Sequence, residues 1–468
     1  AFQHLRDPLD GGRPSGGGDV TTPAAIKRST SGAALVPMIR AREAIEKAMS
    51  LRDKVTPRER LYIEAEWARR NPESKTRDLD HIAGLRKLVE AYPDDLEAKS
   101  ILGLALLDGF EPVTKAPRKN TLEGLALLES IVARDDNNFG AHHYLIHGWE
   151  GSKTPERAWH ACQRYPELVT NIPHALHMPG HIYAQSDRID DAVLAFAAAA
   201  ENELGYLKAD VLYPNGHHGH NVHFLIQALN MDGRYNDSMA RVKHLMNEFK
   251  ETPRDKSSSG QRGAWRQGYF ALVKTLVRFE RWDQILDGTT IPVYEKPEQS
   301  AWRTWAIGLA HANLGHKKEA RASLQQLAEL LTKIESSKRP LGVAHTELLA
   351  TLEARWGDKQ KAWALFEKAD ADEAAMIYSE PPYYPRPAAL GWGRWALQRR
   401  DFASAETAYR RALVREPGSG AAYFGLAAAL KGLGQTAPAD SALASARKAW
   451  DKADADLPQV RSGMRAEP

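Results

Sequence analysis

The C-terminal part of the chain repeats its own pattern at an interval of 34 residues. Small and large apolar residues of one unit return at the matching positions of the next. The first unit carries Ala389, Trp392, Ala405, Tyr409 and Ala412, and the second carries Tyr423, Leu426, Ala439, Leu443 and Ala446. This period predicts two helices per unit, and no stretch shows the two-residue alternation typical of strands. We therefore expect an all-α fold, an α-solenoid in which each unit buries its face against its neighbours.

The pattern resembles the tetratricopeptide repeat (TPR), in which small residues let two antiparallel helices approach and aromatic residues fill the gaps. Other parts of the chain fit the same pattern around Ala192, Ala320 and Ala362. The resemblance implies a curved array of helix–turn–helix units. It also implies a concave groove formed by the first helix of each unit.

Helix signals begin well before these repeats. Thr56-Pro57-Arg58-Glu59 is a capping box with proline at the first helical position, and it predicts a helix through Arg70. Further amphipathic stretches lie near 38–50, 77–91, 95–108 and 121–134. We divide the chain into a flexible leader (1–36), N-terminal helical repeats (37–135), central histidine-rich repeats (136–250), C-terminal TPR repeats (251–456) and a tail (457–468).

Composition excludes several classes of function. The net charge is +3, from 63 basic and 60 acidic residues, which argues against a general nucleic-acid binder. The longest apolar run, 192–200, is too short to span a membrane. The single cysteine, Cys162, excludes an intrachain disulfide and thiolate metal clusters, and we expect it to be a buried packing residue.

The compartment and the oligomeric state do not follow from composition. The chain begins at Ala1 without methionine and shows no signal peptide. We favour an exported, periplasmic mature form over a cytoplasmic one, with a trimmed chain as the alternative.

Histidines concentrate in the centre of the chain, where 142–223 holds 11 of the 17. In proteins with the TPR pattern, positions 2, 5, 9 and 12 of each first helix face the groove. Here the first helices are expected to begin at Phe139, Pro173 and Gly219. Their groove positions then include His143, His147, Glu150, His174, His177, His181, His220, His223, Gln227 and Asn230.

This arrangement predicts a transition-metal site. The pairs His143/His147 and His177/His181 are spaced i,i+4, so both imidazoles of a pair lie on one helix face. Neutral imidazole suits Zn, Cu, Fe and Ni, and we expect Cu, Fe or Zn here. The expected ligands are His143, His147, His177, His181 and His220. Glu150, His174 and His223 are expected as further ligands or acid–base groups.

The leading hypothesis is therefore a metal-dependent enzyme, an oxidoreductase or a hydrolase, acting on a small organic or peptide substrate. A second hypothesis is a scaffold that binds a peptide or protein, with Trp302, Trp305, Gln227 and Asn230 lining the groove. For the two tryptophans, packing against a long loop is the alternative. A third hypothesis is metal storage or delivery. His142 and His160 fall outside the groove positions and are expected to be structural.

Three strings resemble those of a large, mostly uncharacterised family of bacterial TPR proteins. They are the 141–147 string AHHYLIH, the 177–183 string HMPGHIY and the 220–225 string HNVHFL. The resemblance covers roughly residues 60–250 and implies that these motifs belong together. It implies no particular reaction.

Overall fold

The computed structural model describes residues 32–71, 73–210, 216–248, 263–294, 296–334, 338–376 and 381–461. In these ranges the chain is built from helices, with one isolated β-bridge, Phe110 to Pro117, and no strand. The all-α expectation is therefore confirmed. Within the described part, no helix combines the length and the apolar character needed to cross a membrane.

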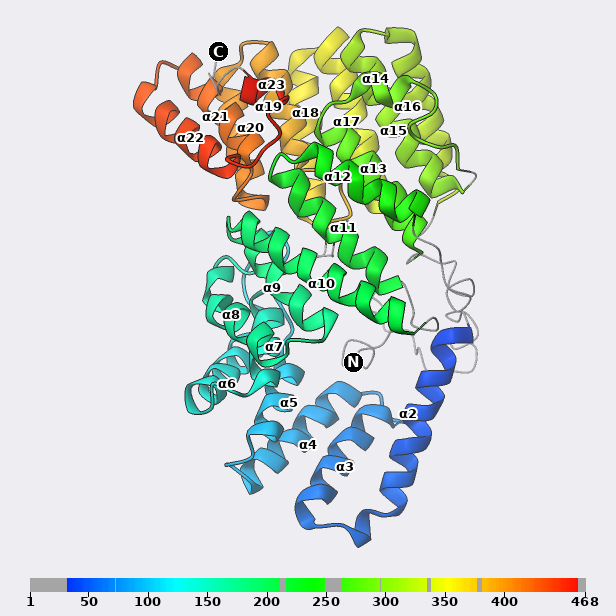
Figure 1. Cartoon of the computed structure of the whole chain (residues 1–468), viewed down its shortest axis with the longest axis vertical. Coiled ribbons are helices and arrows are strands. Elements are labelled where there is room, and N and C mark those ends of the chain that lie inside the picture. The colour runs from blue at the N-terminus through cyan, green and yellow to red at the C-terminus, as the bar shows by residue number, and fades with distance from the viewer. Residues whose placement is uncertain are drawn as a thin grey trace.

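The helices follow one another as antiparallel pairs (Figure 1). The N-terminal part contains α2 (Gly32–Ser50), η2 (Arg52–Lys54), α3 (Pro57–Arg70), α4 (Arg77–Ala91), α5 (Leu96–Leu106) and α6 (Thr121–Arg134). The central part contains α7 (Phe139–Trp149), η3 (Pro155–Ala158), α8 (Trp159–Leu168), α9 (Pro173–Gln185), α10 (Ile189–Ala209), α11 (Gly216–Met231), α12 (Tyr235–Lys243) and the π-helical turn η4 (His244–Glu248).

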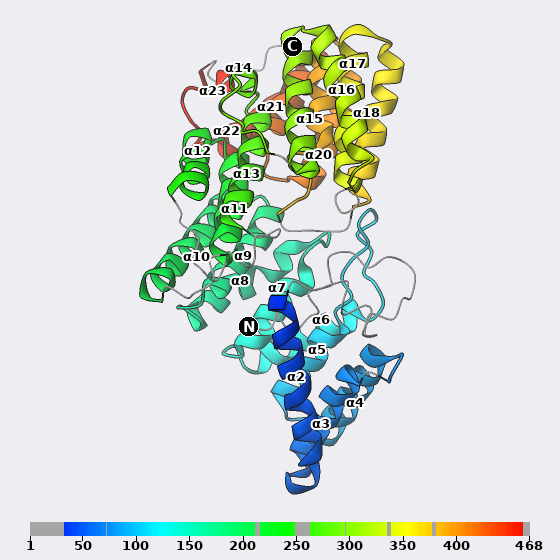
Figure 2. The same ribbon diagram turned by 90° about the vertical axis from the view of Figure 1, so that its right-hand side faces the viewer.

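The C-terminal part continues the same arrangement. It contains α13 (Ala264–Arg278), α14 (Trp282–Leu286), α15 (Pro297–Leu314), α16 (Lys317–Leu331), α17 (Lys338–Trp356), α18 (Lys359–Ala374), α19 (Ala388–Gln398), α20 (Phe402–Arg415), α21 (Gly420–Gly432), α22 (Thr436–Ala449) and α23 (Pro458–Arg461). Figure 2 shows the resulting stack along the long axis of the molecule.

Local signals explain where helices begin. The Thr56 side chain accepts a hydrogen bond from Glu59 N while the Glu59 carboxylate accepts from Thr56 N, so the predicted capping box opens α3. Asn138 caps α7 in the same way through Ala141 N. The expected flexible leader is different. Its last residues, 32–36, belong to α2, and residues 1–31 lie outside the described ranges.

Small residues let the paired helices approach. A Cβ placed on Gly180 of α9 would lie 2.4 Å from the Phe196 ring of α10. A Cβ on Gly393 of α19 would lie 2.7 Å from the Tyr409 ring of α20. The predicted TPR packing of small residues against aromatic rings therefore holds both in the centre and near the C-terminus.

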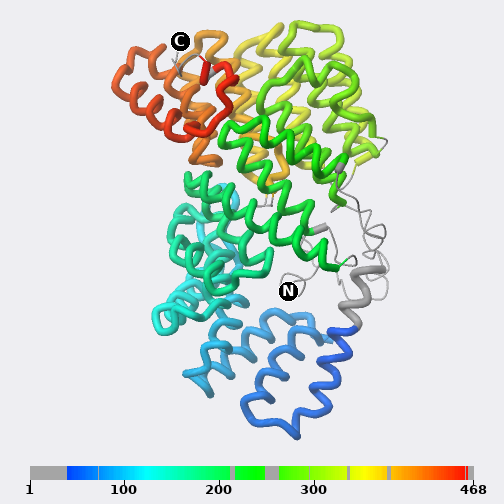
Figure 3. The backbone as a smooth tube through the Cα atoms, viewed as in Figure 1, coloured from blue at the N-terminus to red at the C-terminus, as the bar shows by residue number. Residues whose placement is uncertain are grey.

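First helices of successive pairs also touch one another, as in α5 to α7 to α9 and in α13 to α15 to α17 to α19 to α21. Together with the second helices they form a curved double layer, which Figure 3 traces from the N-terminal to the C-terminal half. The chain is thus a TPR-like solenoid.

The C-terminal end of the solenoid contacts a helix of the central part. Trp450, just after α22, donates its indole N–H to Met231 O of α11 at 3.0 Å. The Arg278 guanidinium of α13 forms two hydrogen bonds with the Glu416 carboxylate, at 2.7 and 3.0 Å, and both side chains are nearly buried. The segment after α22 therefore contacts the central helix α11, and the Arg278–Glu416 pair joins α13 to the end of α20 within the C-terminal part.

Candidate metal centre

Helices α7 and α9 bring three histidines together. The Nε2 atoms of His143 and His174 lie 3.0 Å apart, and one ligand nitrogen each from His143, His147 and His174 lie within 4.8 Å of one another. We call these residues the first histidine set. All three side chains are partly exposed. Two members of the set, His143 and His147, are ligands predicted from the sequence. The third, His174, was predicted as a further ligand or acid–base group.

Glu150 follows α7 directly and lies between histidines of two helices. Its Oε2 atom is 3.5 Å from Nδ1 of His147, and its Oε1 atom is 3.4 Å from Nδ1 of His181. One carboxylate therefore faces both α7 and α9.

The remaining predicted ligands form a second histidine set, His177 and His181 of α9 with His220 of α11. The Nε2 atoms of His177 and His181 lie 2.6 Å apart, and the rings of His177 and His220 have centroids 5.1 Å apart. Helix α9 runs unbroken through Pro179, so His177 and His181 remain one turn apart on the same face.

Phenylalanine rings enclose the second histidine set. Phe196 of α10 and Phe224 of α11 each lie with ring centroids 4.8 Å from that of His177, and Phe224 stacks on His181 at 4.9 Å. His177 and His181 are only 2% and 3% exposed. These two histidines are therefore buried between helices, whereas the sequence predicted an open groove surface.

Burial decides the protonation of the cluster. It lowers the pKa of His177 and of His143 well below the ordinary value, because a protonated ring would lose its water. The neighbouring histidines add to this effect, His181 on His177 and His147 on His143. Burial also lowers the pKa of His174. These three imidazoles are neutral at pH 7, the form that binds metal ions.

The structure does not bring His223 into either set. Its Nδ1 atom lies 2.5 Å from Gln267 Oε1, and its Nε2 atom lies 3.3 Å from Lys274 Nζ. Lys274 also donates to Pro382 O at 2.8 Å, and burial lowers its pKa to about 7. Both ring nitrogens of His223 thus face groups of α13, which corrects its expected place beside the metal ligands.

The residues expected to line a partner groove are buried. Gln227 is 8% exposed, and Asn230, at 2%, donates to the Thr275 hydroxyl of α13. Trp302 and Trp305 pack against Tyr384 of the proline-rich segment 381–387, with ring centroids 6.1 and 5.7 Å away. The groove prediction is wrong for these four residues. Helix α13 covers the first two, and the loop that offered the packing alternative covers the tryptophans.

His142 and His160 meet at Asp136, outside the centre. Nε2 of His142 lies 2.9 Å from Asp136 O, and Nε2 of His160 lies 2.6 Å from the Asp136 carboxylate. Ligand atoms of these three residues also lie within 4.8 Å of one another. The Arg164 guanidinium is 3.4 Å from the same carboxylate and disfavours a cation there. Cys162 is buried, and burial raises the pKa of its thiol, as expected for a packing residue.

Sequence reasoning missed Gln267 and Lys274. A signal existed for the lysine, because it interrupts the apolar run 269–277 of an otherwise buried helix. Such an isolated charge on an apolar face needs a partner or a shifted pKa. No comparable signal marks Gln267, whose partner lies 44 residues away in the chain.

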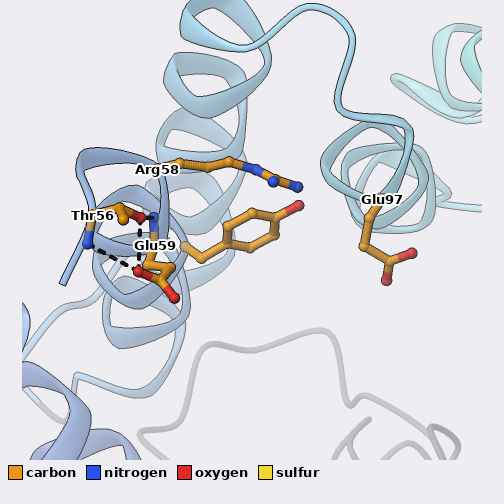
Figure 4. Close-up of a pocket in the computed structure, with 5 residues that line it drawn as sticks. Thr56, Arg58, Glu59 and Glu97 are labelled. Atoms are coloured by element: carbon orange, nitrogen blue, oxygen red, sulfur yellow. Dashed lines mark hydrogen bonds between the residues drawn. The ribbon is translucent and has the colours of Figure 1, made fainter.

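A surface hollow of about 410 Å³ lies far from the histidines, beside the N-terminal helices (Figure 4). Its lining includes Thr56, Arg58, Glu59 and Glu97. Thr56 and Glu59 are engaged in the capping box of α3, and Arg58 pairs with Asp95 at 2.7 Å. These polar groups serve the local fold, and we assign no chemistry to the hollow.

No protein-family model and no curated protein matches this chain. Among solved structures, it is similar to one of Naa15/Naa10 bound to HypK-THB, with 14% identity, 86% of this chain and 66% of that chain covered, and a TM-score of 0.32. It is also similar to a monomeric mutant of IFIT1 with Gppp-AAAA (13% identity, 89% and 76% covered, TM-score 0.33) and to the TPR domain of P58(IPK) (14% identity, 79% and 96% covered, TM-score 0.22). The TPR-like architecture of this chain rests on its own helix pairs and repeated sequence.

Proposed function

We propose that this protein is a metal-dependent enzyme whose transition-metal ion is held by His143, His147 and His174. The observation that carries the proposal is the convergence of three histidine nitrogens, from two successive first helices, within 4.8 Å. Neutral imidazoles suit Zn, Cu and Fe, and burial keeps His143 and His174 neutral.

The exposure of the first histidine set supports catalysis over simple storage. Three protein ligands leave a tetrahedral ion one open position, which is the usual form of a catalytic site. The three side chains are partly exposed, so water or a small organic or peptide substrate can reach that position. Glu150, 3.5 Å from His147, is the nearby carboxylate that can orient a ligand or accept a proton.

The identity of the ion selects the reaction. Bound Zn would lower the pKa of a coordinated water and favour hydrolysis, whereas Cu or Fe would favour oxidative chemistry. The histidine ligands themselves are compatible with all three ions.

The partner-binding alternative has weaker support in the centre of the chain. The four residues expected to contact a peptide, Gln227, Asn230, Trp302 and Trp305, are between 0% and 8% exposed. A scaffold role would need a different surface of the solenoid.

The proposal is tested by elemental analysis of tag-free protein, loaded separately with Zn, Cu and Fe and then desalted. We expect the parent protein to retain metal and the His143→Ala/His174→Ala variant to retain one equivalent less. The matched control is His311→Ala/His316→Ala, since these two histidines also lie close, with Nδ1 atoms 3.2 Å apart, but sit on the distant helix α15 and the turn after it. Failure of the parent protein to retain any of the three ions contradicts the proposal.

A further inference from the structure

We infer that the centre binds two metal ions, the second held by His177, His181 and His220, and that Glu150 is a positioning residue shared by both sites. The inference rests on the proposed function, because it adds a second ion to the one at the first histidine set. It also gives the carboxylate a role distinct from that of a ligand.

Bond lengths argue for the second ion. Imidazole nitrogens lie about 2.0–2.1 Å from Zn, so two ligands of one ion are at most about 4.2 Å apart. Among the described residues, the groups of three whose ligand atoms lie within 4.8 Å of one another include none of His177, His181 and His220. An ion at the first histidine set therefore leaves the His177–His181 pair unused.

The pair itself has the form of a metal site. Two Nε2 atoms lie 2.6 Å apart on histidines spaced i,i+4, so both nitrogens are within reach of one ion. His220 lies across from them on α11, with its ring centroid 5.1 Å from that of His177. The ligand atoms of the three residues do not all lie within 4.8 Å of one another, so the ring of His220 would turn toward the pair to supply the third ligand.

The surroundings of His177 give a second, independent observation. Its Nδ1 atom is buried and has no hydrogen-bond partner among the described residues. Leaving a buried polar atom unpaired costs about 1–3 kcal/mol, and native folds keep few such atoms without a functional reason. Phe196 and Phe224 pack against the His177 ring and fix its position. Its Nε2 atom is the one that would bind the ion.

Glu150 orients one histidine of each site. Its two oxygens face the Nδ1 atoms of His147 and His181, at 3.5 and 3.4 Å. A histidine that offers its Nδ1–H to a carboxylate keeps the Nε2 lone pair for a metal ion, and such carboxylates typically change metal affinity 10–100-fold. For His181, the Nε2 atom is the one that meets His177. One carboxylate thereby lies beside Nδ1 of a ligand in both sites, where an Nδ1–H···O contact would keep each Nε2 lone pair for the ion.

The competing account of the His177–His181 contact is an N–H···N hydrogen bond between two neutral rings. Stoichiometry separates the two accounts. We expect the parent protein, titrated with Zn²⁺ alone and desalted, to retain two equivalents. The His177→Ala/His181→Ala variant should retain one equivalent, and the His143→Ala/His174→Ala variant should retain the other.

A single equivalent in the parent protein, lost on changing His143 and His174, overturns the second ion and leaves the proposed function intact. A parent protein that retains none of Zn, Cu and Fe, each loaded separately, overturns both. Because His177 and His181 are buried, their double variant can fail to fold, so His220→Ala provides a milder test. We expect it to weaken the binding of one equivalent 10-fold or more, and unchanged affinity for both overturns the assignment.

The role of Glu150 is tested with Glu150→Gln. The amide offers one acceptor oxygen where the carboxylate offers two, so at least one histidine loses its orienting partner. We expect a 10–100-fold loss of affinity for at least one Zn²⁺, with an unchanged melting temperature of the metal-free protein. The control is Glu156→Gln, an exposed residue of η3. Equal Zn²⁺ affinity in the parent and Glu150→Gln proteins overturns the positioning role.

Discussion

The central and C-terminal repeats pack their helices in the same way but carry different residues on the first helix of each pair. In α9, the register positions 5 and 9 hold His177 and His181, which are buried. In α19 the same positions hold Leu390 and Arg394, which are partly exposed. The closures of the two pairs nevertheless match, Gly180 against Phe196 and Gly393 against Tyr409. The comparison teaches that the small-residue and aromatic positions make the fold, while the groove positions are free to carry chemistry.

The largest expected effect is local protection by metal. Saturating Zn²⁺ should slow amide hydrogen exchange in α7, α9 and α11 and leave α20–α22 unchanged, because all the proposed ligands belong to the central helices. A ligand at 100 times its Kd stabilises the folded state by about 2.7 kcal/mol, which is a roughly 100-fold slowing of exchange. Hydrogen exchange with mass spectrometry measures this. Equal protection in both regions would contradict the comparison.

The next effect concerns the buried Lys274 beside the centre. Its pKa in the folded state, about 7, lies below the ordinary value of 10.5. Between these two pH values the lysine is protonated in the unfolded chain and neutral in the folded one. The free energy of unfolding therefore rises with pH in this window. Each pH unit in this window changes stability by at most about 1.4 kcal/mol.

Lys274→Met removes this dependence. Denaturant unfolding of the metal-free proteins should therefore show the parent gaining stability relative to Lys274→Met as the pH rises from 7 to 10. Lys448→Met, at an exposed position of α22, serves as the control and should follow the parent. A constant difference between parent and Lys274→Met across this range would show that the lysine is not neutral in the fold.

A pair of glycine substitutions sharpens the comparison. Gly180→Ala and Gly393→Ala each force a methyl group into an aromatic ring, and overpacking of this kind costs about 1–3 kcal/mol. Only Gly180→Ala should also weaken Zn²⁺ binding, since Phe196 packs on His177 and His181. Thermal melting and Zn²⁺ titration test both variants. A loss of metal affinity in Gly393→Ala as large as in Gly180→Ala would break the distinction.

The smallest effect is at the contact between the two regions. Lys452 and Asp190 form an ion pair at 2.8 Å, with side chains 49% and 43% exposed. Exposed pairs of this kind contribute about 0–1 kcal/mol, so Lys452→Ala should leave the melting temperature nearly unchanged. A loss above about 2 kcal/mol would mean that this pair, rather than the buried Trp450, dominates the contact between the regions.

The fold followed from local signals. The 34-residue period, the capping box at Thr56 and the small residues opposite aromatic rings act over short distances in the chain, so they could be predicted from the sequence. The expected first helices at Phe139 and Pro173 begin at those residues in the structure, and the third begins at Gly216, three residues before the expected position.

The site was predicted only in part. Helical spacing could place His143 beside His147 and His177 beside His181, because each pair lies on one helix. Helical spacing could not show that His174 lies beside the first pair, or that His223 contacts Gln267 and Lys274. These contacts depend on how separate helices pack. The burial of Trp302 and Trp305 depended likewise on a segment about 80 residues later.

Metal content is the most direct test of the central claim, that the histidine interior of α7, α9 and α11 is a metal centre. The measurement is the metal-to-protein ratio of the tag-free parent, loaded separately with Zn²⁺, Cu and Fe and desalted, beside the His143→Ala/His174→Ala and His311→Ala/His316→Ala variants. We predict stoichiometric Zn²⁺ in the parent and in the second variant, and a loss of one equivalent in the first. A parent that retains no Zn²⁺, Cu or Fe would contradict the account and leave the cluster as a packed set of neutral histidines.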